Sequence, residues 1–554
     1  MKKIIISIII LLGSTSAFAQ QNDKLLQTLK SELNYSMEHL QKQPDHKPYY
    51  MSMRVEDKYT LVLKSSFGNK NGEEEGRARL FSPQIRIGSK QLDNFKYTTQ
   101  GTQQYQGMSV SQPTMLPLDD NATDGIRAAI WKETNSRYKY ACQVFDEAKT
   151  KVATTAANED KAACFSDAPV EKYYDASIDN RYYHIDKAGW LKKLNEISAA
   201  FKAEPELLSG QANLTYQVSR IYFINTDGSE VIQNRICGRI MLSTQAVAAD
   251  GMSLPLNKDY LAYDLDSLPS VEKMVADAKD MVKRVLALRN APVADPYTGP
   301  AMLSGEASGV FFHEIFGHRL EGHRLKEGGE TFKKMVGKLV LPKEFQVYCD
   351  PTLRHYAGTD LNGYYKYDDE GVKARRVNNV VNGTLKSFLM SRVPLDGFPE
   401  SNGHGRTSDD KDPVSRQSNL IVETNKPYTE AQMRQMLRAE AKKQGKEYGY
   451  YFKTVTSGYT YTGEGGSLNS FNVTPLEVYR IFADGRPDQL VRGVDLIGTP
   501  LSMFSHITAA GKNASVFTGV CGAESGWVPV TAVSPTIFVT QIETQRRAKS
   551  NYVP

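Results

Sequence analysis

Two histidines and a glutamate lie close together in the second half of the chain, in the segment His313-Glu314-Ile315-Phe316-Gly317-His318. Neutral imidazole nitrogens are good ligands for Zn²⁺, and a carboxylate next to such a ligand can take a proton from bound water. The chain has nine histidines in 554 residues, so this pattern arises by chance in on the order of one such chain in a hundred. The segment therefore indicates a hydrolytic zinc site, and a pair of solvated or core histidines is the alternative.

The spacing of the two histidines departs from the common H-E-x-x-H motif, in which they lie four residues apart on one helical face. Here they are five residues apart, and a regular α-helix would turn the second imidazole about 140° away from the first. One zinc ion could not accept both ligands in that geometry. We therefore expect a π-bulge, which closes i→i+5 hydrogen bonds and brings His313 and His318 onto one face, with Gly317 permitting the distortion.

A catalytic zinc needs a third protein ligand and one open position. The candidates are two residues close to the motif and several farther away: Glu321, His323, His355, His404, His506 and the cysteines. Cys521 stands out because it lies in Gly519-Val520-Cys521-Gly522, where the flanking glycines permit a tight turn that projects a thiolate. The alternative is that Cys521 is a small buried apolar residue, the commonest fate of a free cysteine.

Other side chains near these motifs are weaker candidates. Glu321 follows His318 by three residues and is expected either to orient its ring or to be a surface charge. Arg406 and Arg416 are candidates to clamp a substrate carboxylate, although solvated loop arginines are more frequent. The segment TGEGGS at residues 462–467 would let a peptide backbone approach and add as a strand, or is a flexible loop.

The elements that must position these residues follow from the apolar periodicity. Helical spacing occurs in the first half at residues 23–42, 131–157, 190–202 and 270–289. Strand-like alternation occurs at residues 51–87, 216–223 and 231–242. We interpret the helix at 131–157 as an exposed excursion. The second half is rich in glycine and strands, with one helix that carries the His-Glu motif and another near residues 429–444.

We expect an α+β fold, because 554 residues exceed one ordinary domain and the two halves differ in pattern. Three prolines interrupt the periodicity within residues 290–300, where we place the boundary. The predicted organisation is a signal peptide at 1–19, an N-terminal mixed α/β domain with the helical excursion at 20–289, and a C-terminal β-rich catalytic domain with the metal-binding helix at 290–554. The formal net charge is only +5 and there is no basic block, which excludes a nucleic-acid-binding groove.

The first residues have the pattern of a secretory signal peptide. Lys2 and Lys3 precede a short apolar run, and the segment ends in Ala17-Phe18-Ala19. We expect cleavage after Ala19, a periplasmic or secreted protein and no membrane anchor after cleavage; the alternative is an uncleaved N-terminal anchor. An oxidising compartment favours cysteine pairing. Cys142 and Cys164 are placed to bridge locally, but the sequence does not determine the pairing among these two, Cys237 and Cys349.

The segment HEIFGHRLEG at residues 313–322 resembles the signature of the TldD/PmbA family of metallopeptidases, also called modulators of DNA gyrase. Further stretches agree with that family in the same order along the chain. They are residues 369–371 with 382–386, residues 402–406 with Pro413, Arg416 and Asn419, and residues 520–522 with 528–530 and 534–536. The resemblance covers roughly residues 281–543.

This resemblance implies that His313, His318 and Cys521 hold Zn²⁺ and that Glu314 is the general base. It also implies a homodimer, or a heterodimer with a paralogue, and peptide or unfolded-protein substrates held in extended form. We therefore expect a zinc-dependent peptidase that hydrolyses such peptides by means of a zinc-activated water. The alternatives are a non-catalytic zinc-stabilised binding or assembly subunit of a heterodimeric peptidase, and a hydrolase of other amide or ester bonds.

Overall fold

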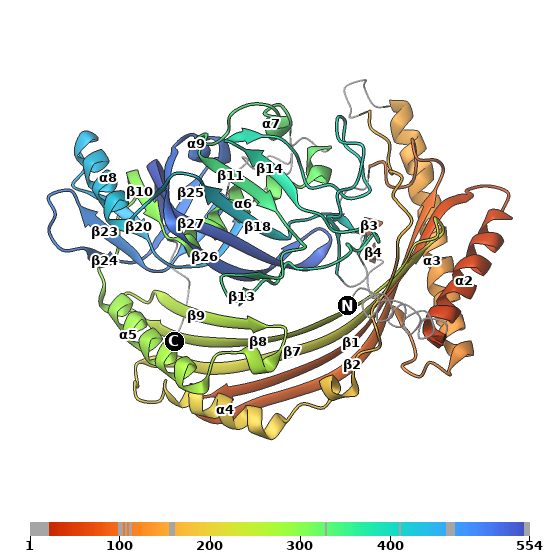
Figure 1. Ribbon diagram of the computed structural model, residues 1–554, viewed down its shortest axis with the longest axis horizontal. Helices are drawn as coiled ribbons and strands as arrows, with labels where there is room; N and C mark the ends of the chain where they lie inside the picture. Colours follow the sequence, from red (N-terminus) through yellow and green to blue (C-terminus); the bar gives the residue numbers. More distant parts are fainter. Residues whose placement is uncertain are drawn as a thin grey trace, which may run out of the picture.

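The computed structural model describes residues 22–97, 104–105, 108–109, 114–154, 161–326, 330–408, 411–460 and 471–547. The chain has an α+β fold, which confirms the expected fold class. One large sheet is built from residues 48–262 and curves around a second sheet built from residues 297–546 (Figure 1). The expected signal peptide and the TGEGGS segment lie outside the described residues.

The first sheet consists mainly of long antiparallel strands in the order β5-β2-β1-β7-β8-β6, with β9 beside β8. Its strands are β1 (Pro48–Ser66), β2 (Asn69–Ile87), β5 (Thr114–Met115), β6 (Lys172–Tyr174), β7 (Leu207–Asn225), β8 (Glu230–Val247) and β9 (Ser253–Ala262). Phe67 and Gly68 join β1 to β2, and both have the positive φ that a two-residue hairpin turn needs. The expected strands in this half are confirmed: residues 51–87 form most of the β1–β2 hairpin, and β7 and β8 extend beyond their predicted bounds.

Helices cover the outer, convex side of this sheet (Figure 1). They are α2 (Lys24–Gln41), α3 (Thr123–Thr154), α4 (Lys187–Ala199) and α5 (Val271–Asn290). Asp23 and Ser270 cap the first backbone N–H groups of α2 and α5, as N-terminal caps should. Residues 131–157 were interpreted as an exposed helical excursion, but this part of α3 buries one face: Ala141 is 3% exposed and lies in the same apolar core as Phe81 of β2.

The second sheet is organised around one long strand, β27, which pairs with β10, β18, β25 and β26. The sheet comprises β10 (Tyr297–Leu303), β11 (Phe345–Cys349), β14 (Val377–Val381), β15 (Thr384–Leu385), β18 (Asn419–Thr424), β19 (Pro427–Tyr428), β20 (Tyr448–Phe452), β21 (Val455–Thr460), β22 (Phe471–Pro475), β23 (Val478–Phe482), β24 (Gln489–Val491), β25 (Val494–Gly498), β26 (Ile507–Ala523) and β27 (Gly526–Arg546). Three short pairs lie apart from the large sheets: β3 (Gln104–Tyr105) with β4 (Met108–Ser109), β12 (His355–Tyr356) with β13 (Thr359–Asp360), and β16 (Gly405–Arg406) with β17 (Val414–Ser415).

The helix that carries the His-Glu motif is α6 (Gly305–Ile315), which packs against β26 and β27. Its sequence is apolar around most of its circumference, and Phe311 and Phe312 are fully buried, so the helix lies inside the domain rather than on its surface. The expected second helix is α8 (Glu430–Lys443), where Thr429 and Gln432 form a capping box. Two short helices, α7 (Glu330–Lys333) and α9 (Pro500–Ser505), complete this half.

Ionic and polar contacts join the two sheets. Arg54 pairs with Asp369 at 3.1 Å, Lys366 pairs with Asp175 at 2.7 Å, and Arg239 donates to the Thr518 carbonyl at 3.3 Å. The last contact reaches β26, the strand that carries Cys521. In the described part of the chain, no helix combines the length and apolar character needed to cross a membrane.

All five cysteines lie within the described residues, and all five are free. The local bridge considered for Cys142 and Cys164, one of the pairings that the sequence left open, is therefore not formed. Cys142 lies on α3, whereas the Cys164 thiol donates a hydrogen bond to the Gln91 carbonyl at 3.3 Å. The segment that carries Cys164 is thus held against the loop after β2 by hydrogen bonding.

Candidate metal centre

The helix that carries the motif ends between its two histidines. α6 stops at Ile315, Phe316 has φ −121° and ψ −51°, and Gly317–Arg319 forms the 3₁₀ turn η3. Nη1 of Arg319 donates to the carbonyls of Glu314 and Ile315 at 3.0 and 3.2 Å, which satisfies acceptors that a helix end leaves open. The predicted π-bulge is therefore wrong: a helix end followed by a tighter turn brings His318 back towards His313.

A glycine at position 317 leaves room for the side chain of Gln417, which lies against this turn. A Cβ on Gly317 would lie 1.8 Å from Oε1 of Gln417. Gln417 donates from Nε2 to the His313 carbonyl and from its backbone N–H to Glu321, both at 3.3 Å. Gln417 carries no signal that predicts its role from the sequence; it holds the backbone of His313 and the carboxylate of Glu321, which contacts His318.

The structure brings His313, His318 and Cys521 together. One ligand atom from each residue lies within 4.8 Å of the others, and this trio is the metal-binding group found among the described residues. The two imidazole rings are 4.9 Å apart at 79°, and Sγ of Cys521 lies 3.4 Å from Nε2 of His318. All three side chains are buried, at 9%, 5% and 7% exposure. Three soft or borderline donors converging on one point fit a metal ion.

Cys521 reaches this point from the hairpin of β26 and β27, where it pairs with Val528. Burial would raise the pKa of its thiol, but His318 and His313 outweigh burial and hold this pKa well below the usual value. Burial would likewise lower the pKa of His318, but Glu321 and Cys521 raise it to about 10. The ring of His318 and the thiol of Cys521 therefore each favour the charged form of the other.

Glu314 lies beside the three ligands rather than among them. Its Oε2 is 4.0 Å from Nε2 of His318, and its side chain is 7% exposed. Burial raises the pKa of this carboxyl group, whereas His313 and His318 lower it. Because the Glu314 carboxylate lies 4.0 Å from a ligand nitrogen, it is placed to accept a proton from a molecule bound at the candidate metal centre.

The weaker candidates are all buried, but they have different contacts. Glu321 is fully buried, so it is not a surface charge. It accepts a hydrogen bond from Nδ1 of His318 at 3.0 Å, and Nε2 of the same ring faces Cys521. Arg406 donates to the Gln417 and Pro529 carbonyls at 2.6 and 2.7 Å. Arg416 donates to the Cys521 carbonyl at 2.8 Å. Neither arginine is solvated, and both support the backbone of the site instead of facing a substrate carboxylate.

The other histidines considered as third ligands have separate partners. His404 is fully buried between Asn402 and Ser418, with Nε2 3.1 Å from the serine hydroxyl. His355 pairs with Asp360, and His506 contacts Thr540. His323 pairs with Glu524 on the turn of the β26–β27 hairpin. Among the third-ligand candidates considered, Cys521 is therefore the one that joins His313 and His318 in the group of metal ligands.

Gly458 is a second residue that the sequence analysis missed. It lies in β21, which passes directly over Glu314, and a Cβ at this position would lie 2.5 Å from Cγ and 3.0 Å from Oε1 of that glutamate. Its φ is not in the left-handed region, so the requirement is for space and not for backbone freedom. No signal in the sequence marks it, because glycines are frequent throughout this half.

We predict that Gly458→Ala will displace the Glu314 carboxylate without removing the ligands. A displacement of about 1 Å of a reacting group can reduce a rate by about 10²-fold. We expect kcat for a peptide substrate to fall by about that factor while the metal content per chain is unchanged. Gly76→Ala is the matched control, since a Cβ there meets no atom within 4 Å. Full activity of Gly458→Ala would contradict this assignment.

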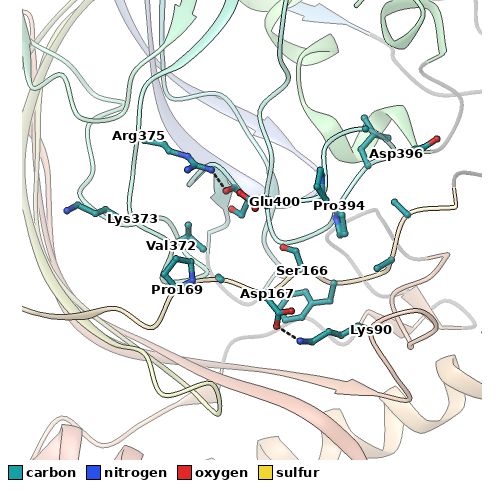
Figure 2. A pocket seen from close by; sticks show the side chains of 18 of the residues that line it. Lys90, Ser166, Asp167, Pro169, Val372, Lys373, Arg375, Pro394, Asp396 and Glu400 are labelled. Atoms are coloured by element: carbon teal, nitrogen blue, oxygen red, sulfur yellow. Dashed lines mark hydrogen bonds and ion pairs between the residues drawn. The ribbon is translucent and has the colours of Figure 1, made fainter.

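A cavity of about 1090 Å³ lies apart from this centre, between residues 162–171 and loops of the second half (Figure 2). Lys90 and Asp167 form an ion pair at its wall, and Arg375 donates to the Ser401 carbonyl at 2.6 Å. None of its lining residues belongs to the group of two histidines, cysteine and glutamate. This cavity is therefore separate from the candidate metal centre.

Two imidazoles and one thiolate are a donor set that suits zinc, and three protein ligands leave the fourth position open, as in catalytic sites. Together with the adjacent carboxylate, they define a candidate metallohydrolase centre within an α+β fold. Residues 296–546 match the family model of the PmbA/TldA metallopeptidase C-terminal domain.

Similar proteins agree with that match. The chain is 28% identical over 258 residues to Metalloprotease MJ0996 of Methanocaldococcus jannaschii, which covers 46% of this chain and 52% of that protein. It is 25% identical over 257 residues to a zinc metalloprotease TldD homolog of Saccharolobus solfataricus, with 46% and 52% covered. These two alignments thus span about half the length of each relative.

Solved structures share the fold over nearly the whole chain. The structure of TldE from Thermococcus kodakarensis superposes with a TM-score of 0.61 at 14% identity, covering 94% of this chain and all of that one. A protein of Thermotoga maritima, described as a candidate modulator of a DNA gyrase, gives a TM-score of 0.60 at 13% identity and covers 93% and 99%. The common architecture therefore includes the curved first sheet, which the family model does not cover.

Proposed function

We propose that this protein is a zinc-dependent peptidase of the TldD/PmbA family, with His313, His318 and Cys521 as ligands and Glu314 as general base. The observation that carries the proposal is the position of Glu314, whose carboxylate lies 4.0 Å from a ligand nitrogen. A purely structural zinc needs no such carboxylate beside it. The family match over residues 296–546 and the relatives named metalloproteases support the same activity.

In the proposed hydrolysis, Glu314 transfers the proton, while Glu321 and Arg319 hold the groups around it in position. When bound, zinc lowers the pKa of water and polarises a carbonyl group. Glu314 takes a proton from the attacking water and passes it to the leaving amine. Glu321 holds the ring of His318 through Nδ1, and Arg319 holds the helix end from which Glu314 projects.

We propose that the substrates are extended or unfolded peptides. Glu314 and the three ligands are each less than a tenth exposed, so the surface of a folded protein cannot reach them. The extended strand β21 borders Glu314 at Gly458, and peptides are often recognised by lying alongside such a strand. A single extended segment is the form of substrate that fits this approach.

Our proposals for the place of action and for the assembly rest on the N-terminal sequence and on the names of similar proteins. Residues 1–19 have the pattern of a cleavable signal peptide, so we propose a periplasmic or secreted enzyme cleaved after Ala19. We also propose a dimer, either of two copies or with a paralogue, because one of the similar structures is called TldE while a curated relative is called a TldD homolog. Electrophoresis of the exported protein and its mass in solution test these two statements.

Metal removal tests the activity itself. The purified protein is expected to contain one zinc per chain, to cleave an unfolded casein and to leave a stable globular protein intact. Incubation with a chelator such as 1,10-phenanthroline should abolish cleavage, and added zinc should restore it. If the zinc-loaded chain leaves casein intact both alone and with its paralogue, the peptidase proposal is wrong.

A further inference from the structure

The hairpin that carries Cys521 has little apolar packing near its turn. The core cluster at that end of β26 and β27 consists of Cys521, Val528 and Val530. On the opposite face Val520 and Trp527 are 46% and 67% exposed. Because apolar stabilisation scales with the area removed from water, three small side chains hold this end of the hairpin only weakly. Some other interaction must hold Cys521 against the histidines.

Charged side chains supply that interaction. Nε of Arg324 lies 2.7 Å from Oε2 of Glu321, and Nη2 of the same arginine lies 2.7 Å from Oε2 of Glu524. His323 contacts the other oxygen of Glu524. Exposure of these side chains ranges from 0% to 17%, so water screens the pairs much less than it screens surface pairs.

Arg324 pairs with two carboxylates, those of Glu321 and Glu524. One lies on the turn that carries His318, and the other lies on the hairpin that carries Cys521. Glu321 accepts a hydrogen bond from His318 and follows it by three residues. Glu524 follows Cys521 by three residues on the turn of the hairpin. Arg324 therefore connects the segment that carries His318 to the segment that carries Cys521, through one carboxylate on each segment.

We propose that Arg324 and Glu524 form an ionic latch that closes the Cys521 hairpin onto the histidine turn. Both are positioning residues: they set the place of the cysteine sulfur and touch no substrate. The inference rests on the proposed metal centre and adds the device that assembles it. Arg416 is a further contact of the hairpin that does not involve Glu524: it lies 3.4 Å from Glu321 and donates to the Cys521 carbonyl and to the Ser525 hydroxyl at 2.8 and 2.9 Å. The hairpin thus stays folded when the latch is opened.

The latch is tested with Glu524→Gln, Arg324→Gln and the double variant. In the metal-free protein, the rate at which iodoacetamide alkylates Cys521 is measured by peptide mass spectrometry. In a separate measurement, zinc affinity is found by competition with a chromophoric chelator. Groups that orient metal ligands typically contribute about 10–100-fold to affinity. We expect each single variant to bind zinc about 10-fold more weakly and to expose Cys521 to alkylation about 10-fold faster.

The effect of the double variant should be smaller than the sum of the two single effects, because both changes remove the pair between Arg324 and Glu524. Glu38→Gln is the control, since it removes an exposed ion pair with Lys42 on α2, and it should change neither measurement. Unchanged alkylation and affinity in the single variants would overturn the latch. Loss of the cooperative unfolding transition in Glu524→Gln and also in Glu524→Asp would do the same, because the pair would then stabilise the whole domain.

Failure of the latch is distinguishable from failure of the proposed function. If the wild-type chain binds no zinc, the metal centre is wrong, yet the alkylation comparison still shows whether Arg324 and Glu524 close the hairpin. If the wild-type chain binds zinc and hydrolyses casein while the variants behave like it in both measurements, the function stands and the latch is wrong.

Discussion

Glu314→Gln is expected to abolish peptide hydrolysis while the protein keeps its zinc. The amide has nearly the shape of the carboxylate but cannot accept a proton at neutral pH, and general base catalysis contributes about 10²–10⁴-fold. Because Glu314 lies beside the three ligand atoms and is not one of them, the affinity for zinc should change little. Casein cleavage and zinc content, measured on the same preparation, check both halves of this prediction.

A half-buried glutamate on the same helix provides the control. Glu306 lies in the first turn of α6 and accepts a hydrogen bond from the Val455 backbone N–H at 3.4 Å, an interaction that glutamine can also accept. Glu306→Gln removes a charge from the same helix far from its C-terminal end, and cleavage should persist. Retained cleavage in Glu314→Gln would remove the general base from the proposal and favour another group in that role.

The second large effect is expected for Cys521→Ser, which should lose both zinc and activity. Zinc binding in structural sites is worth about 10–16 kcal/mol over four ligands, so one ligand accounts for about 3 kcal/mol, or about 10²-fold in affinity. A serine hydroxyl is not ionised at neutral pH, whereas the Cys521 thiol has a pKa held well below its ordinary value. Chelator competition measures the loss.

Cys142→Ser is the matched control for that substitution. Cys142 is half-buried on α3, is unpaired like Cys521, and contributes nothing to the group of three ligands. The control should keep one zinc per chain and full cleavage. If Cys521→Ser also keeps full zinc content and activity, the third ligand is another residue and the arrangement around His318 needs a different explanation.

The sequence was sufficient for the parts of this protein that depend on local pattern. Apolar periodicity placed α2, α5 and α8 within a few residues of their bounds, because a helix that buries one face must repeat its apolar residues at helical spacing. The adjacent His313 and Glu314 indicated metal chemistry through their residue types alone. The order of four separated motifs added Cys521, which spacing could only suggest.

Local pattern failed where the conformation depends on residues distant in the chain. The spacing of His313 and His318 predicted a π-bulge, but α6 ends at Ile315, because Arg319 binds its last carbonyls and Gln417 packs on Gly317. Arg406 and Arg416 were candidates for a substrate clamp, with solvated loop positions as the alternative. Both are buried and donate to backbone carbonyls of the hairpin and its neighbours.

What the sequence by itself determined is the set of chemical groups: two imidazoles, one carboxylate beside them and one isolated thiol. Only the tertiary structure decided that these groups meet. Cys521 lies 203 residues from His318, yet its sulfur is 3.4 Å from the ring. The contacts that bring them together run between α6, β21 and the β26–β27 hairpin, and they include Gly458, Arg324 and Glu524. Such contacts depend on packing between distant segments, which leaves no periodic signal in the chain.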